Sequence, residues 1–390
     1  MSASISSGMT GTPPAAATPP GRCSALSRAS PLCKSRSRTK ALAQLVVLAL
    51  VAILLTCAVA NSDVLAQQTA PDKSNPASLR PINIGFLRHA VGPWMARIAD
   101  GGIDSTTGRT IRWFPHDTDS SIVVDISSGR LDIGLIGAAV AAAAIVRGLD
   151  LRIFYVLGGS PDSDGLVVGP SIDQGDARSL AAKVIAVPFG STPHFRLLES
   201  LKHLGATLPS LRVVNLQTSQ IRDAWRRGEV DAAAGSDPLL TELSARGHRM
   251  PLANSGPHSG LLVLAAQADF ATQHSVFLSR YIDIIARAEK VRASRDRPYT
   301  TDDPDIKAIA QATGLLPDAI ASTIARVQPP PLAEQLSNKW LGGGIESGLV
   351  AHLKSTVDIW RWAGRLPARE PDFIAAITLV PAQMALGYQK

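Results

Sequence analysis

Cysteine is nearly absent from this sequence. The 390 residues contain only three cysteines, Cys23, Cys33 and Cys57, and all of them lie within the first 60 positions. A disulfide-stapled scaffold is therefore excluded, because such folds need bridges spread along the chain. Beyond residue 66 there is no thiol, so thiolate catalysis and cysteine-ligated metal sites are excluded for that part as well.

Acidic residues are missing from the front of the chain. The first 40 residues contain no Asp or Glu but six basic residues, which are Arg22, Arg28, Lys34, Arg36, Arg38 and Lys40. Residues 41–60 are almost wholly apolar, and small residues recur at 58–60 and 64–66. This pattern predicts a secretory signal peptide over residues 1–66, cleaved after Ala66 or, as the next choice, after Ala60.

Two other interpretations of this segment stay open. Twenty residues at 1.5 Å per residue are just long enough to span the ~30 Å hydrocarbon layer, so a retained membrane anchor is compatible with residues 41–60. Lipoprotein processing at Cys57 is the third interpretation, although the preceding Leu54, Leu55 and Thr56 match that signal poorly. We expect a periplasmic protein, with residues 67–81 as a flexible, polar tether.

Little net charge remains after the predicted cleavage. The whole sequence has 39 Lys and Arg against 32 Asp and Glu, a formal net charge of +7. Residues 1–66 hold six of the basic residues and one acidic residue, Asp63, so 33 basic and 31 acidic residues remain. A net charge of +2, with no basic run interleaved with aromatic residues, gives no support to nucleic-acid binding.

Short apolar runs alternate with amphipathic stretches through the middle of the chain, which predicts α/β units with mostly parallel sheets. The predicted strands are 82–87, 109–114, 131–136, 152–157, 166–168, 184–188, 211–216, 230–234 and 261–265. The predicted helices between them are 94–99, 121–128, 138–147, 193–204, 219–227 and 238–245. The last third is predicted to be helical over 269–292, 305–313, 317–326 and 348–363.

Several segments of the chain resemble a known family of binding proteins. Residues 183–205, KVIAVPFGSTPHFRLLESLKHLG, run from a buried strand into a helix, and RVVNL and AWRRGEVDAA follow at 212–216 and 224–233. Residues 127–137, SSGRLDIGLIG, form a helix, a turn and a strand. Together they resemble the taurine, alkanesulfonate and nitrate family of periplasmic substrate-binding proteins, the taurine-binding branch most, over roughly residues 82–380.

The resemblance implies both a fold and a function. The fold is a type II clamshell of two lobes, each a mostly parallel sheet flanked by helices, with a helical C-terminal tail. Residues 82–163 and 257–390 are expected to form the first lobe with the tail, and residues 164–256 the second lobe. The function is the extracytoplasmic solute-binding component of an ABC importer, which binds taurine or another small sulfonate between the lobes and delivers it to a membrane permease with its cytoplasmic ATPase. No enzymatic activity, cofactor, metal or nucleic acid is expected.

The candidate ligand-binding residues lie where helices follow strands. Helices that begin near residues 121, 138 and 192 present unpaired N–H groups and about half a positive charge to an anion. A sulfonate has three acceptor oxygens and no proton to donate, so backbone N–H and hydroxyl groups suit it. The candidate residues are His89, Asp117, Ser120, Ser121, Ala138, Ala139, Asp164, Ser191, Thr192, His194, Ser236 and Asp237.

Some of these residues have a purely structural interpretation. Thr192 suits a helix N-cap with Pro193 at the first helical position. The serines at 120–121 suit the same role in the first lobe, and Asp237 suits it for a helix that starts at Pro238. His194 is able to pack inside the protein instead of facing the cleft. The sequence alone leaves both interpretations open for each of them.

Four positions depart from the pattern that the resemblance implies. Ala138 and Ala139 stand where relatives carry small hydroxyl residues, and Ser236 stands where taurine binders carry a tryptophan. Leu262 lies near the position of an acidic residue that relatives use for an amine. Asp237 or Asp164 is able to take over that role, so the resemblance does not identify the ligand.

Two other classes of function stay open. The first is an enzyme on the same fold, such as a menaquinone-pathway-like enzyme or another lyase. Its desulfinase branch uses a cysteine nucleophile, which is excluded here, and the eight histidines show no metal-binding or His–Asp spacing. The second is a ligand sensor anchored by residues 41–60, although no signalling domain accompanies the clamshell.

Overall fold

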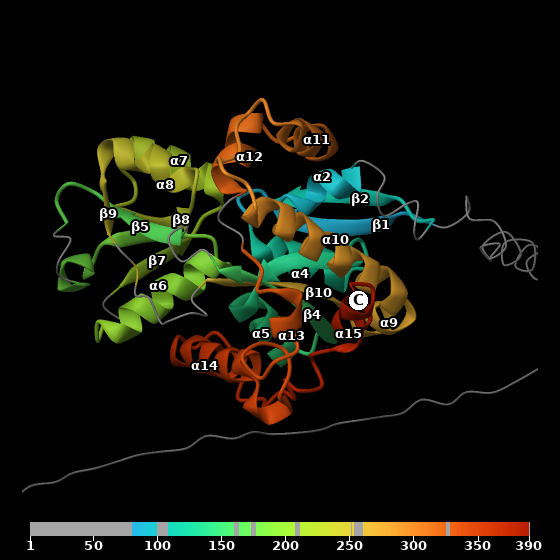
Figure 1. The fold of residues 1–390 in the computed structure, drawn as a ribbon. Helices are drawn as coiled ribbons and strands as arrows, with labels where there is room; N and C mark the ends of the chain where they lie inside the picture. Colours follow the sequence, from blue (N-terminus) through green and yellow to red (C-terminus); the bar gives the residue numbers. More distant parts are fainter. Residues whose placement is uncertain are drawn as a thin grey trace, which may run out of the picture. The chain divides into compact units, whose positions relative to one another are not determined.

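The computed structural model describes residues 80–99, 108–159, 164–172, 177–206, 211–250, 252, 260–324 and 328–389, which belong to one compact unit (Figure 1). The predicted signal peptide over residues 1–66, including Cys57, lies outside these residues, as does nearly all of the predicted tether. In the part that is described, no helix combines the length and the apolar character needed to cross a membrane.

Five strands form the first sheet, in the order β2-β1-β3-β10-β4. They are β1 (Ile82–Leu87), β2 (Ile111–His116), β3 (Ile133–Gly137), β4 (Leu151–Gly159) and β10 (Leu261–Gln267). β1 pairs in parallel with β2 and β3, whereas β10 runs antiparallel between β3 and β4. Every residue of β3 is buried, because the strand lies at the centre of the sheet and helices α4 (Asp119–Ser127) and α5 (Ala138–Val146) pack beside it.

The second sheet repeats this plan, in the order β7-β6-β8-β5-β9. Its strands are β5 (Asp164–Val168), β6 (Val184–Val187), β7 (Arg212–Asn215), β8 (Ala232–Ser236) and β9 (His248–Met250). β6 pairs in parallel with β7 and β8, and β5 runs antiparallel between β8 and β9. α6 (Thr192–His203) covers one face, and α7 (Thr218–Arg227) and α8 (Leu239–Leu243) cover the other.

This arrangement confirms the predicted two-lobed α/β fold, with one antiparallel strand in each otherwise parallel sheet. The chain passes between the sheets twice, from β4 to β5 and from β9 to β10. The predicted lobe boundaries, at 163/164 and 256/257, fall within or beside segments 160–163 and 253–259, which lie outside the described residues.

Helices make up the tail that follows β10. They are α9 (Ala268–Gln273), α10 (Ser275–Ala293), α11 (Pro304–Thr313), α12 (Pro317–Thr323), α13 (Leu332–Gln335), α14 (Gly348–Trp362) and α15 (Val380–Gly387). α10 and α11 pack against α2 (Trp94–Ala99) of the first lobe, and α15 packs against α10. The tail thus belongs mainly to the first lobe, as Figure 1 shows.

Three local predictions need correction. The continuous helix predicted over 269–292 is broken at His274, where φ is −119° and ψ is 28°, outside the helical region. The N-cap of α6 is Ser191 and not Thr192, since the Ser191 Oγ accepts the His194 N–H at 3.2 Å. β9 was not predicted, because a strand of three residues shows no periodicity.

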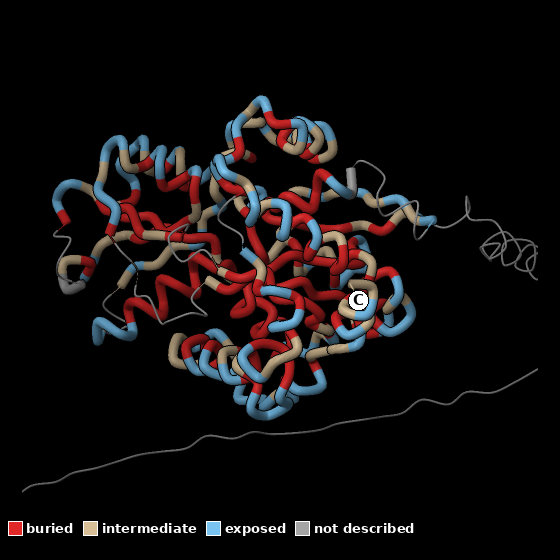
Figure 2. Tube along the Cα trace, viewed as in Figure 1, coloured by how far each residue is buried: buried red, intermediate tan, exposed pale blue. Residues whose placement is uncertain are grey.

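Helix α14 contacts both lobes. The indole of Trp360 packs with Ala139 of α5 and Phe195 of α6, and its Nε1 donates to the Ala139 carbonyl at 3.0 Å. Figure 2 shows the buried residues gathered in the interior of the fold, and every residue of α5 is buried. Helix α14 of the tail therefore contacts α5, which packs on the first sheet, and α6, which packs on the second.

The tail also contacts the outer strand of the first sheet. The side-chain amide of Gln335, which is fully buried, accepts from the Val156 N–H at 3.1 Å and donates to the Val156 carbonyl at 2.8 Å. A few residues away, Ile153 of β4 forms a parallel bridge with Ile377. The open side of β4 is in this way hydrogen-bonded by two separate parts of the tail.

Candidate functional site

A cavity of about 320 Å³ lies where strands from both sheets end. Its walls come from the first lobe, the second lobe and the α11–α12 region of the tail. The lining residues are Arg88, His89, Asp117, Thr118, Asp119, Pro188, Ser191, Pro193, Thr218, Arg222, Gly235, Ser236, Asp237, Pro238, Leu239, Gly314, Leu315, Leu316 and Ala319. Because the segments after β1, β2, β6 and β8 all reach this cavity, it lies at the carboxyl ends of parallel strands, where α/β proteins bind ligands.

The two lobes meet at the carboxylate of Asp119, beside the cavity. Asp119 is the first residue of α4, and only 1% of its surface is exposed. Its Oδ1 accepts the Gly137 N–H at 2.6 Å and the Thr192 hydroxyl at 3.2 Å, and its Oδ2 accepts the Thr192 N–H at 2.9 Å. One carboxylate thus binds the N-terminal ends of α5 in the first lobe and α6 in the second.

Glycine at position 137 makes this close approach possible. A Cβ added to Gly137 would lie 2.0 Å from the Thr192 hydroxyl oxygen, which no real side chain tolerates. Gly190, with φ of +74°, approaches Ser120 of the first lobe in the same region. The contact between the lobes therefore depends on small residues on both sides.

The hydroxyls of Ser191 and Thr192 already have partners in the protein. Ser191 donates to the Pro188 carbonyl at 2.6 Å and caps α6, although it also lines the cavity. Thr192 is buried, bonds to Asp119 and does not line the cavity. Both residues remain predicted ligand contacts, but each has a structural role here.

Asp164 and Ser236 face each other across β5 and β8. The Ser236 hydroxyl donates to Asp164 at 2.5 Å, and Ser236 lines the cavity. Burial raises the pKa of Asp164, which the nearby His89 and the Ser236 hydrogen bond partly oppose. Asp164 is therefore a second buried acid close to the cavity, on the first strand after the crossing.

Asp237 lines the cavity and also serves the helix that follows it. Its Oδ1 accepts the Thr241 N–H at 3.2 Å and the Thr241 hydroxyl at 2.8 Å, in the first turn of α8. Arg249 of β9 forms an ion pair with the same carboxylate. The N-cap of α8 is Pro238 and not Asp237, because the helix begins at Leu239, although Asp237 still bonds to Thr241 in its first turn and lines the cavity.

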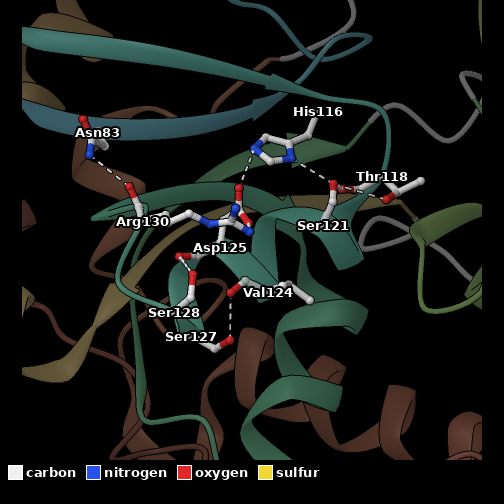
Figure 3. A network of polar contacts seen from close by, with 9 residues as sticks. All are labelled: Asn83, His116, Thr118, Ser121, Val124, Asp125, Ser127, Ser128 and Arg130. Atoms are coloured by element: carbon white, nitrogen blue, oxygen red, sulfur yellow. Dashed lines mark hydrogen bonds and ion pairs between the residues drawn. The ribbon is translucent and has the colours of Figure 1, made fainter.

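His116 holds the start of α4 in place (Figure 3). Its Nδ1 lies 2.8 Å from the Ser121 hydroxyl, and its Nε2 lies 3.7 Å from Asp125, which also pairs with Arg130. The Ser121 hydroxyl donates to the Thr118 carbonyl at 2.8 Å. The serine at this helix start therefore bonds to the end of β2 and to the residue before α4, and it does not line the cavity.

The remaining predicted residues divide between the cavity and the interior. His89 and Asp117 line the cavity, and Asp117 pairs with Arg88 at 3.1 Å. Ser120, whose Oγ lies 3.1 Å from the Thr118 hydroxyl, does not line it. Ala138 and Ala139 are buried in α5, and Leu262 is buried on β10, so none of the three lines the cavity.

Several cavity residues were missed by the sequence analysis. Thr218 and Arg222 come from α7, and residues 314–316 and Ala319 come from the tail. Asp119 stands next to the predicted Ser120, but its carboxylate meets residues 18 and 73 positions away along the chain. No local pattern in the sequence predicts such contacts. The one general signal is that an acidic side chain in the first turn of a helix is stabilised by the positive end of the helix dipole.

In the part of the chain that the structure describes, no group of three or more His, Cys, Asp and Glu residues is arranged to hold a metal ion. The charged groups at the cavity instead include the bases Arg88, His89 and Arg222 and the acids Asp117, Asp119 and Asp237. The cavity thus offers groups of both signs to a small polar ligand.

Comparison with known proteins gives relatives of one kind. The chain is 26% identical over 283 residues to the taurine-binding periplasmic protein of Escherichia coli (strain K12), covering 72% of this chain and 86% of that protein. It is 23% identical to the putative aliphatic sulfonates-binding protein of the same organism, covering 66% of this chain and 78% of that one. No protein-family model matches the sequence.

Solved structures share the fold. The alkanesulfonate-binding protein SsuA from Xanthomonas axonopodis pv. citri, bound to MOPS, superposes with a TM-score of 0.59 at 21% identity, covering 77% of this chain and 99% of that one. The desulfurization enzyme DszB superposes with a TM-score of 0.50 at 14% identity, covering 79% and 100%. The fold alone therefore does not separate binding proteins from enzymes.

Proposed function

We propose that this chain, a relative in sequence of taurine- and sulfonate-binding periplasmic proteins, is the extracytoplasmic solute-binding component of an ABC importer. The observation that carries the proposal is the cavity at the carboxyl ends of strands from both sheets. A volume of about 320 Å³ falls in the range of small-molecule sites and suits an organic anion of the sulfonate class.

The compartment and the partners follow from the same proposal. Residues 1–66 act as a signal peptide, so the protein reaches the periplasm, where its relatives work. There the loaded protein delivers its solute to a membrane permease, which a cytoplasmic ATPase drives. A retained anchor over residues 41–60 would place the same clamshell at the membrane surface.

Arg222 is the residue that we expect to bind the acidic group of the solute. It lines the cavity from α7, and its Nε donates to Glu242 at 2.6 Å, which positions the guanidinium at the wall. A charge-assisted hydrogen bond contributes roughly 1.5–3 kcal/mol. Because micromolar affinity needs about −8 kcal/mol, several such bonds and burial of the carbon chain must together exceed the cost of ordering the lobes.

Binding without turnover is the expected activity, because the relatives in sequence are binding proteins. Two of the three cavity aspartates, Asp117 and Asp237, each pair with an arginine. The alternative is an enzyme on the same fold, which the similarity to DszB keeps open. Product analysis after incubation with each ligand separates the two.

A thermal-shift panel with calorimetry tests the function. The protein, purified after export from a bacterial host, should be stabilised by one or a few compounds among aminosulfonates, alkanesulfonates, sulfate esters, nitrate and pyrimidine precursors, and should leave them unchanged. No stabilisation by any of them would remove the binding assignment. Turnover of a stabilising compound would favour the enzyme.

Two arginines on one helix supply a matched pair of variants. Arg222 and Arg226 both pair with Glu242, but only Arg222 lines the cavity. Arg222→Gln should weaken binding of the ligand found in the panel by about tenfold or more, since a tenfold change corresponds to 1.4 kcal/mol. Arg226→Gln should leave the affinity unchanged, and equal effects of the two substitutions would contradict the assignment of Arg222.

A further inference from the structure

The carboxylate of Asp119 occupies a position that is built for an anion. Helix N-termini carry unpaired N–H groups and a partial positive charge, and two of them, from α5 and α6, converge on this one side chain. Three donors bind it, from Gly137 and Thr192. A small anion that entered this part of the cleft would need the same donors.

Asp119 differs from the other two aspartates at the cavity wall because no cationic side chain of the described residues pairs with it. Asp117 pairs with Arg88, and Asp237 pairs with Arg249. No Lys, Arg or His of the described residues forms an ion pair with Asp119, although it is buried and lines the cavity. All three of its hydrogen-bond donors are uncharged, which favours a positive group of the solute as its charged partner.

We propose that Asp119 determines the specificity of the cleft: it excludes simple anions from the N-termini of α5 and α6 and favours a solute that carries a positively charged group. Resting on the proposed function, this narrows the solute class from sulfonates in general to aminosulfonates and similar zwitterions. The amine lies toward Asp119, and the acidic group lies toward Arg222 on the opposite lobe.

The chain holds the two lobes together through the same residue. Since Asp119 bridges Gly137 and Thr192, loss of its carboxylate frees donors in both lobes at once. An anion of similar size is then able to take its place. Removal of Asp119 should therefore strengthen the binding of simple anions and weaken the binding of zwitterions.

The test compares taurine, ethanesulfonate and inorganic sulfate by calorimetry on the full exported protein and its variants. Taurine and ethanesulfonate differ only by the amine, so the wild type should bind taurine at least about tenfold more tightly. Asp119→Ala should bind sulfate and ethanesulfonate at least about tenfold more tightly than the wild type does and should lose its preference for taurine. Asp119→Asn, which keeps the shape without the charge, should also lose the preference for taurine, and it serves if Asp119→Ala fails to fold.

Asp125→Asn is the matched control, because Asp125 lies on the same helix and faces His116 and Arg130 (Figure 3). None of these three residues lines the cavity. It should keep the wild-type preference. An unchanged ratio of taurine to ethanesulfonate affinity in both Asp119 variants would overturn the proposal. If the wild type binds no sulfonate, the proposed function fails, yet a gain of sulfate binding in Asp119→Ala would still support the exclusion of anions by Asp119, and no gain would overturn it.

Discussion

The imidazole of His194 is buried between two aromatic rings, where the second lobe contacts α14. It stacks on Phe189 with ring centroids 4.6 Å apart and meets Trp360 edge-on at 5.2 Å. Its Nδ1 accepts the Gly190 N–H at 3.1 Å, which requires the neutral ring. Burial, reinforced by the positive charge of Arg365, lowers the pKa of His194 to about 3.

A histidine held neutral in the fold makes stability depend on pH. The unfolded chain takes up a proton on this ring below about pH 6.5, whereas the folded chain does so only near pH 3. The free energy of unfolding should therefore decrease as the pH falls from 7 to 4. His194→Asn, whose side-chain oxygen is able to accept the Gly190 N–H, should remove part of this decrease.

Urea unfolding at several pH values measures the effect. His203→Asn, at the exposed end of the same helix, is the matched histidine control. If the free energy of unfolding changed equally with pH in the wild type and both variants, His194 would not be the group that titrates.

Residue identities near the cavity were more predictable than residue roles. His89, Asp117, Ser191, Ser236 and Asp237 were predicted and do line it. For Ser191, the capping hydrogen bond shows a role that the sequence analysis had assigned to Thr192. The hydrogen bonds of Asp119 to Gly137 and Thr192 could not be predicted from the sequence. They join the N-termini of three helices that only the tertiary fold brings together.

Among the elements, α14 has a role that its sequence does not suggest. Its amphipathic pattern predicts a helix, and the structure shows that its buried face contacts α5 and α6 together. Strand predictions held for the long apolar runs, since period and burial coincide there, and failed for β9, where three residues carry too little pattern.

Trp360 is expected to be the main contact of this helix with the two lobes. Trp360→Ala should lower the free energy of unfolding by about 3–5 kcal/mol, because the indole is 2% exposed and its removal leaves a cavity. Trp360→Phe should cost less, about 1–3 kcal/mol, since it mainly leaves the Ala139 carbonyl without its donor.

Chemical denaturation of the purified variants checks this prediction. Asp358→Ala, on the exposed face of α14, should stay within about 0.5 kcal/mol of the wild type. A loss for Trp360→Ala no larger than that of the control would mean that α14 contributes little to holding the lobes.

At the scale of the whole molecule, the alternation of strands and helices was enough to predict two α/β lobes. Such units have few topologies open to them, and each sheet here follows the same strand order. The sequence did not predict that the α11–α12 region lines the cavity. The pattern of apolar residues in a helix shows which face is buried, but not which distant segment that face contacts.

Export of the whole chain is expected to remove its charged leader. Cleavage after Ala66 should give a periplasmic protein whose first residue is Gln67. N-terminal sequencing of the protein from the periplasmic fraction checks this. A chain that starts at Asn61 would point to the second cleavage site, and a full-length chain in the membrane fraction would favour the anchor.

The hydrogen bonds that join Gln335, Ala376 and Thr378 to β4 have a consequence for solubility. β4 is the last strand of its sheet, and the outer edge of a strand of this kind is a template on which a second molecule is able to add a strand. Here the side-chain amide of Gln335 and the main chain beside Ile377 saturate that edge at Val156 and Ile153. We therefore expect the tail to prevent aggregation through the edge of β4. A chain shortened before Gln335 would lose this protection together with α14 and α15.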